Sequence, residues 1–181
     1  MPIRAEFLAL PFLASLLIGC RWVGEEAVPP QELLDVAYVV FAPVTEDDLT
    51  SPVAIGSEPR AALVAPTPAE FRYRLRLPDR ALLTFSIGIA ETGDTSSEGT
   101  LPGNRMRFRI YVSEELSESV IYERAIHIAR QREWIEQWVD LSRFAGKEVW
   151  LTFETDFPGA ETGTPLPLVG VFADPVLHDR A

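Results

Sequence analysis

Apolar and polar residues alternate with a period of two along several short stretches of the chain. Between Phe71 and Leu77 every odd-numbered position is apolar or aromatic and every even-numbered position is an arginine. The same alternation recurs from Met106 to Val112 and from Lys147 to Thr155. Successive side chains of a strand point to opposite faces, so each stretch predicts a β-strand with one buried side and one solvent-facing side.

Other strands are predicted where apolar, β-branched and aromatic residues cluster between turn residues: Leu33–Phe41, Ala81–Ala90, Val120–Ile128, Trp134–Leu141 and Leu168–Leu177. Loops are predicted where Gly, Pro, Ser, Thr and Asp gather: Val44–Pro59, Glu91–Asn104 and Asp156–Pro167. A helix across Glu114–Glu133 is an alternative to the strand in that region. Short strands separated by turns favour an all-β sandwich of two antiparallel sheets.

The chain opens with a short apolar segment that ends in a cysteine. After Arg4, the stretch from Phe7 to Ile18 carries no charge and has the length of a signal-peptide core, shorter than the roughly 20 residues of a spanning helix. It closes in Leu17-Ile18-Gly19-Cys20, which holds the only cysteine. This run resembles the lipobox of bacterial lipoproteins. The resemblance implies that Cys20 is acylated, for example with palmitate, and becomes the mature N-terminus.

These features divide the chain into three expected parts: a signal peptide at 1–19, a lipidated cysteine and tether at 20–31, and a β-sandwich domain at 32–181. Two alternatives stay open, namely a secretory signal cut at another bond and a buried N-terminal helix with an ordinary core cysteine. Two or three acyl chains would hold the protein stably on a membrane of the cell envelope, on its extracytoplasmic side. Because Arg21 follows the cysteine, the resemblance implies the outer membrane if the cell is Gram-negative.

The chain is acidic and rich in apolar residues. Its 16 Lys and Arg against 27 Asp and Glu give a net charge of −11, which argues against nucleic acid as the main partner. A hydrophobic content of 47% indicates a folded domain rather than a disordered chain. The sequence contains no HExxH, GxGxxG, Walker or nucleophile-elbow motif, so we expect no enzymatic activity and no cofactor.

Three stretches between residues 60 and 177 share a further pattern. They are Arg60–Pro78 with Leu83–Ile89, then Trp134 with Val139-Asp140-Leu141-Ser142-Arg143-Phe144-Ala145-Gly146-Lys147 and the strand to Thr155, and finally Val171–Leu177. Together they resemble galactose-binding-like jelly-roll domains, the fold shared by many carbohydrate-binding modules. The resemblance implies a jelly-roll topology, and it says little about the ligand because this fold hosts many binding roles.

The central motif has a simple structural interpretation. Asp140 or Ser142 is expected to hydrogen-bond the backbone of the following turn, as such side chains commonly do. Gly146 is expected to adopt a positive φ before the next strand. The motif therefore predicts a strand, a tight turn and another strand, with no chemistry of its own.

Two arginine rows form the main candidate binding surface. They occupy the polar faces of two predicted strands: Arg72, Arg74 and Arg76 on one, and Arg105, Arg107 and Arg109 on the other. Arginine pairs well with carboxylate and sulfate groups, so these rows predict a cationic patch for uronic-acid or sulfated glycans or for an acidic partner. The alternative is cross-strand pairing with Glu123, Glu148 or Glu154.

Tryptophans supply a second candidate. Trp150 alternates with Val149, Leu151 and Phe153, so it is expected to face outward, where it can stack on a sugar or fill a partner's pocket. A loop or the N-terminal strand covering it is the alternative. Trp134 and Trp138 are interpreted as packing residues.

Carboxylates and histidines are the candidates for metal binding and catalysis. Six loop carboxylates could supply oxygens to a structural Ca²⁺ ion, which similar domains often carry: Glu91, Asp94, Glu98, Asp156, Glu161 and Asp174. Surface solvation is the alternative for all of them. A carboxylate pair for glycoside hydrolysis is the least favoured hypothesis. His127 is interpreted as a core histidine.

The sequence thus predicts a lipid-anchored, non-catalytic envelope lipoprotein that acts as a binding or accessory module for a glycan or a partner protein. The alternative is a structural subunit of an envelope membrane complex with no small ligand. A glycan binder should display an exposed aromatic residue among polar neighbours, whereas a structural subunit should display a broad apolar patch.

Overall fold

The computed structural model describes residues 31–33, 38–41, 50–64, 69–91, 103–115, 117–130, 133–159 and 168–180. The predicted signal peptide, the lipidation site Cys20 and the tether up to Pro30 lie outside these residues. No helix within the described ranges has the length and apolar character needed to cross a membrane.

Most of the described residues belong to strands. In chain order these are β1 (Gln31–Glu32), β2 (Tyr38–Phe41), β3 (Thr50–Ile55), β4 (Glu58–Val64), β5 (Ala69–Arg76), β6 (Ala81–Glu91), β7 (Arg105–Glu114), β8 (Ser117–His127), β9 (Ile135–Asp140), β10 (Glu148–Asp156) and β11 (Leu168–Asp179). Two short 3₁₀ turns, Ile128–Arg130 and Ser142–Phe144, follow β8 and β9.

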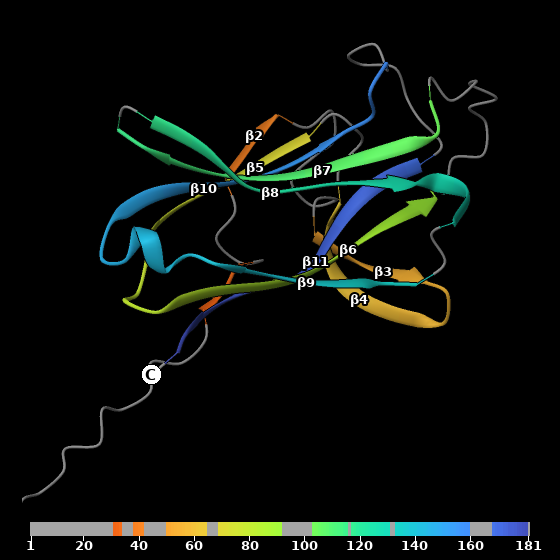
Figure 1. The fold of residues 1–181 in the computed structure, drawn as a ribbon. Helices are drawn as coiled ribbons and strands as arrows, with labels where there is room; N and C mark the ends of the chain where they lie inside the picture. Colours follow the sequence, from red (N-terminus) through yellow and green to blue (C-terminus); the bar gives the residue numbers. More distant parts are fainter. Residues whose placement is uncertain are drawn as a thin grey trace, which may run out of the picture.

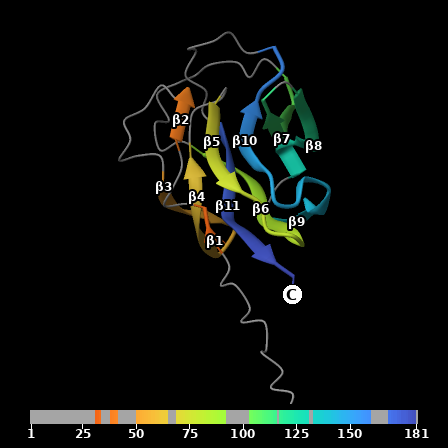
Figure 2. The ribbon, with the colours of Figure 1, turned by 90° about the vertical axis from the view of Figure 1, so that its left-hand side faces the viewer.

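The strands form two antiparallel sheets that lie face to face (Figure 1). Sheet I has the order β3-β4-β11-β6-β9, with β1 added against β11, and sheet II has the order β2-β5-β10-β7-β8. Seen from the end, each sheet runs across the molecule in this order (Figure 2). The expected jelly-roll sandwich of two antiparallel sheets is therefore confirmed.

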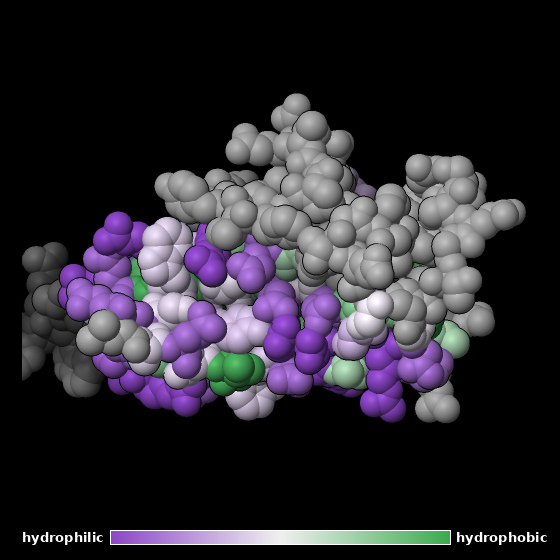
Figure 3. Space-filling model, turned by 90° about the horizontal axis from the view of Figure 1, so that it is seen from above, coloured by the Kyte–Doolittle hydropathy of each residue, from purple (hydrophilic) through white to green (hydrophobic). Residues whose placement is uncertain are grey.

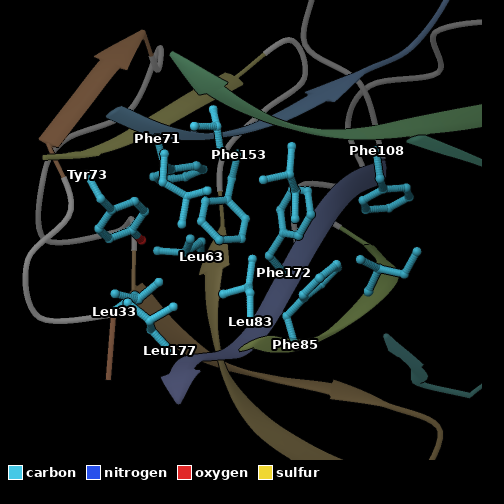
Figure 4. Packing of buried hydrophobic residues seen from close by; sticks show 14 of the residues in the cluster. Leu33, Leu63, Phe71, Tyr73, Leu83, Phe85, Phe108, Phe153, Phe172 and Leu177 are labelled. Atoms are coloured by element: carbon cyan, nitrogen blue, oxygen red, sulfur yellow. The ribbon is translucent and has the colours of Figure 1, made fainter. Parts of the chain in front are cut away.

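Apolar residues of both sheets meet in one central core (Figure 4). The inward-facing positions of β5, β7 and β10 are the alternating apolar residues of the sequence, such as Tyr73, Phe108 and Phe153. Phe172 of β11 is fully buried among Phe85, Phe108 and Phe153, with ring centroids 5.1–6.0 Å away. The opposite face of sheet II is therefore left for solvent or ligand. Part of the opposite face of sheet I is covered by a second, smaller buried cluster that includes Ile55, Trp134 and Val171.

Three sequence expectations need correction in the first half of the chain and in β8. Within the predicted strand Leu33–Phe41, Tyr38–Phe41 form β2 of sheet II, whereas Leu33 lies just after β1 and outside a strand; residues 34–37 lie outside the described residues. The predicted loop Val44–Pro59 contains β3 and the start of β4, joined by a tight hairpin at Gly56, whose φ is +66°. The alternative helix across Glu114–Glu133 is wrong within its described residues, which form β7, β8 and a 3₁₀ turn.

The motif after β9 has the predicted structure. The backbone N–H of Ser142 donates to Oδ1 of Asp140 at 2.8 Å, and Gly146 has a φ of +69°. The Gly146 N–H then donates to the carbonyl of Leu77 at 2.9 Å, and the Leu77 N–H donates to the carbonyl of Lys147 at 3.0 Å. These two bonds hold the turn between β9 and β10 against Leu77, the residue that follows β5 of sheet II.

Candidate binding site

The two arginine rows lie on the same surface, the outer face of sheet II. Strand β10 lies between β5 and β7 and pairs with both. Trp150 stands directly opposite Arg74 on one side and Ser113 on the other. Directly opposed residues of neighbouring strands share a face, so both rows and Trp150 face outward together.

Four of the six arginines form ion pairs with carboxylates of the same face. Their pairs are Arg72–Glu70 at 3.4 Å, Arg74–Glu148 at 2.6 Å, Arg107–Asp156 and Arg109–Glu154. Within the described residues no ion pair is found for Arg76 or Arg105. Most arginines of the two rows are therefore already paired, and the alternative of cross-strand pairing holds for Glu148 and Glu154. A cationic binding patch stays a prediction. The third residue of that alternative, Glu123, lies opposite Arg109 in the register of β7 and β8.

The ion pairs differ in their exposure along β10. The side chains of Arg109 and Glu154 are 22% and 14% exposed, whereas those of Arg74 and Glu148 are 61% and 59% exposed. A pair as exposed as Arg74–Glu148 contributes at most about 1 kcal/mol to stability and keeps hydrogen-bonding capacity for a ligand. The buried end of the face thus holds the strands together, and the exposed end is open to solvent.

The pKa values of two side chains beside Glu154 and Asp156 are raised. Burial, followed by hydrogen bonding to Glu154, raises the pKa of Tyr111 to about 12. The hydrogen bond to Asp156 outweighs desolvation and raises the pKa of Arg107. Both side chains therefore keep their protons at neutral pH, and Tyr111 and Arg107 stay hydrogen-bond donors.

Trp150 is flanked by hydrogen-bonding groups on both sides. Its side chain is 40% exposed, as the alternation predicts. On the β5 side lies the Arg74–Glu148 pair. On the β7 side the hydroxyl of Ser113 donates to Glu118 at 3.0 Å. An indole face bordered by a guanidinium, two carboxylates and a hydroxyl matches the mixed apolar and polar surface of a sugar ring.

The surface around this site is hydrophilic. Seen from the side of sheet II, the described residues are mainly polar and the apolar ones are scattered (Figure 3). Among the described residues the exposed large apolar side chains are Val120, Trp138 and Trp150. Three dispersed residues do not make the broad apolar patch expected of a structural subunit.

Other sequence-predicted residues have mixed outcomes. Trp134 is a packing residue as expected, since it is 9% exposed and its indole N–H donates to the carbonyl of Glu58 at 2.9 Å. Trp138 is not a packing residue, because its side chain is 68% exposed on the outer face of sheet I. His127 is half-buried on β8 opposite Arg105, not in the core, and its Nδ1 accepts from the Ala129 N–H at 3.3 Å.

The calcium hypothesis finds no cluster to support it in the part of the chain that the structure describes. Of the six candidate carboxylates, Glu91, Asp156 and Asp174 are described, and no group of three His, Cys, Asp or Glu able to hold a metal occurs among the described residues. Asp156 binds Arg107 in sheet II, while Asp174 lies on β11 of sheet I. Asp94, Glu98 and Glu161 lie outside the described residues.

Comparison with solved structures identifies the fold. A structure from Clostridium perfringens ZmpB, comprising its M60 catalytic domain with the CBM51-1 and CBM51-2 domains, superposes with a TM-score of 0.54 at 14% identity, over 86% of this chain and 16% of that one. A second, containing CBM51-2 in complex with GlcNAc and the INT domains of the same protein, gives 0.52 at 12% identity, over 84% of this chain and 32% of that one. The fold is therefore that of carbohydrate-binding-module jelly rolls.

Sequence comparison adds little about activity. No protein-family model matches the chain. An uncharacterised protein of Archaeoglobus fulgidus is 32% identical over 87 residues, which is 46% of this chain. The matched part spans only 20% of that relative's length.

Proposed function

We propose that this chain is a non-catalytic binding domain that takes neutral sugars of a glycan on the outer face of sheet II, around Trp150. The observation that carries the proposal is an indole 40% exposed on a hydrophilic face, with hydrogen-bonding groups on both neighbouring strands. Sugars present an apolar C–H face and a rim of hydroxyls, so a flat aromatic ring with polar neighbours suits them. The jelly-roll fold supports the same assignment by analogy alone.

The charges of this face favour neutral sugars over sulfated or uronic ones. Arg74 beside Trp150 is already paired with Glu148, and Glu118 adds a second carboxylate nearby. The whole chain carries a net charge of −11, which repels polyanions. Paired side chains still offer both donors and acceptors, which is what vicinal hydroxyl groups require.

The same surface is less suited to a protein partner or to catalysis. A specific protein interface buries about 800 Å² on each side and is anchored by several apolar or aromatic residues, whereas this face offers Trp150 with Val120 as its exposed large apolar side chains. The carboxylates Glu148, Glu154 and Asp156 each bind an arginine. That arrangement fits positioning of side chains rather than proton transfer to a substrate.

Affinity gel electrophoresis of the full chain tests this function. Gels containing xylan, galactan, mannan or β-glucan are compared with gels containing heparin or polygalacturonate. We expect at least one neutral polysaccharide to slow the protein, and the polyanions to leave its mobility unchanged at physiological salt. If only the polyanions slow the protein, the proposed preference for neutral sugars is wrong. The arginine rows would then be the binding surface for uronic-acid or sulfated glycans that the sequence predicts.

We also propose that Cys20 is lipidated and holds this domain on an envelope membrane, close to surface glycans. The proposal rests on the resemblance of Leu17-Ile18-Gly19-Cys20 to a lipobox. Mass spectrometry of the membrane-extracted protein should show a chain that begins at an acylated Cys20, with residues 1–19 removed. An unmodified Cys20, or a mature N-terminus at another residue, would refute the anchor without affecting the sugar site.

A further inference from the structure

Trp138 stands alone on the other surface of the sandwich, the outer face of sheet I. It lies on β9, the last strand of that sheet, and its 68% exposure is the highest among the large apolar side chains described. Trp138 is far from Trp150, because the central core separates the outer faces of the two sheets (Figure 1). An exposed indole is a flat apolar surface, and covering it with a ligand removes that surface from water with a gain in free energy.

Hydrogen-bonding side chains surround Trp138 on neighbouring strands. Thr84 of β6 lies directly opposite it. The Thr84 hydroxyl shares a 2.8 Å hydrogen bond with Nε2 of His178 on β11. A hydroxyl and an imidazole therefore lie beside the indole on the side that leads toward the middle of the sheet.

Two carboxylates flank Trp138 along its own strand, each held in place by other groups. Glu136 accepts a hydrogen bond from the Ser86 hydroxyl at 2.7 Å and forms an ion pair with Arg60 at 2.6 Å. Desolvation alone would raise the pKa of Glu136, but these contacts outweigh it and lower that pKa below its usual range. The N–H of Ser142 holds Oδ1 of Asp140 and lowers the pKa of Asp140. Both groups are therefore ionised acceptors at neutral pH, about 6.6–7 Å on either side of Trp138 along the strand.

We propose that Trp138, with Thr84, His178, Glu136 and Asp140, forms a second sugar-binding site, which makes the domain bivalent for neutral glycans. This inference rests on the proposed function of the Trp150 face. The fixed carboxylates exclude sulfated and uronic sugars by charge repulsion and accept hydroxyl protons of a neutral ring stacked on the indole. With one site on each outer face, one molecule bridges two glycan chains.

A protein partner fits this face less well than a sugar. Around Trp138 the neighbouring apolar side chains, Leu82 and Val176, are half-buried and no second large apolar side chain is exposed among the described residues of sheet I. Protein interfaces need several anchors over a much larger area. One indole with a ring of hydrogen-bonding groups matches a single sugar unit.

Affinity electrophoresis and precipitation of the full chain test this second site. The probe is the neutral polysaccharide that most slows the wild type. Trp138→Ala should weaken retardation by about tenfold, as loss of an aromatic anchor does, and Thr84→Val should weaken it less. Asp79→Ala, in the exposed turn between β5 and β6, changes a surface residue outside both sites and is the control, with unchanged melting temperatures as the check on folding.

Precipitation separates two sites from one. The wild type should cross-link and precipitate the soluble polysaccharide, whereas Trp138→Ala and Trp150→Ala should each still bind yet no longer precipitate it. If Trp138→Ala binds and precipitates like the wild type while Trp150→Ala is impaired, the second site is wrong and the proposed function stands. If Trp150→Ala behaves like the wild type and Trp138→Ala loses binding, the Trp150 site is wrong, and so is bivalency. Retardation by no neutral polysaccharide overturns both.

Discussion

Replacing Phe172 with alanine is expected to lower the free energy of unfolding by about 3–5 kcal/mol. The Phe172 side chain is fully buried at the centre of the sandwich. Its ring packs edge-to-face on Phe108 and Phe153, at centroid distances of 5.5 and 5.1 Å, and is tilted against Phe85 at 6.0 Å. Alanine would leave a cavity where four aromatic rings from both sheets meet (Figure 4), and would lose the edge-to-face contacts in addition to the buried area.

Urea unfolding of the wild type and of Phe172→Ala measures this effect. A domain of this size has a total stability of about 5–15 kcal/mol, so the variant should lose a large fraction of it. Val120→Ala, at a side chain 50% exposed, is the matched control and should change stability by less than about 0.5 kcal/mol. Similar effects of the two substitutions would mean that Phe172 does not sit in the packed centre.

The alternation of residues predicted three of the central strands well. For β5, β7 and β10, each inward residue of the sequence pattern is buried in the structure, because one buried face imposes a period of two. The sequence did not predict β3, because Pro52 and several turn-forming residues interrupt the alternation of apolar and polar positions in that segment. Pro52 is tolerated because β3 is the edge strand of sheet I, where a missing N–H breaks no bond to a further strand.

The candidate site was predicted less completely than the fold. The outward directions of the arginines and of Trp150 followed from local alternation. Their ion pairs depend on the register of β10 with β5 and β7, which lie far away in the sequence, so local patterns could not distinguish paired from free arginines. The outward position of Trp138 was predictable from the sequence. Glu136, Trp138 and Asp140 alternate with the less polar residues Ile135, Gln137 and Val139 along β9, just as the arginines alternate with apolar residues along β5 and β7.

Replacing Trp150 with alanine is expected to weaken binding of a neutral polysaccharide about 30-fold, which corresponds to about 2 kcal/mol. The substitution removes the flat apolar surface between Arg74 and Ser113 and leaves their hydrogen bonds to Glu148 and Glu118 in place. Stability should change little by comparison, since the indole lies on the outer face rather than in the core. Binding and folding are thus separable at this position.

Trp150→Phe is the matched variant for the stacking interaction. Phenylalanine keeps an aromatic face and lacks the indole N–H, so it should bind more tightly than the alanine variant. Equal loss in both variants would point to the indole hydrogen bond rather than to stacking. Neither substitution should create affinity for heparin, because the arginine pairs of the face are unchanged.

Isothermal titration of the wild type, Trp150→Ala and Trp150→Phe with the neutral polysaccharide that retards the protein tests the sugar site most directly. We predict dissociation constants that rise in the order wild type, phenylalanine, alanine, with unchanged melting temperatures. The same dissociation constant for the wild type and Trp150→Ala, in a protein that still binds the polysaccharide, would contradict the assignment of sugar binding to the outer face of sheet II.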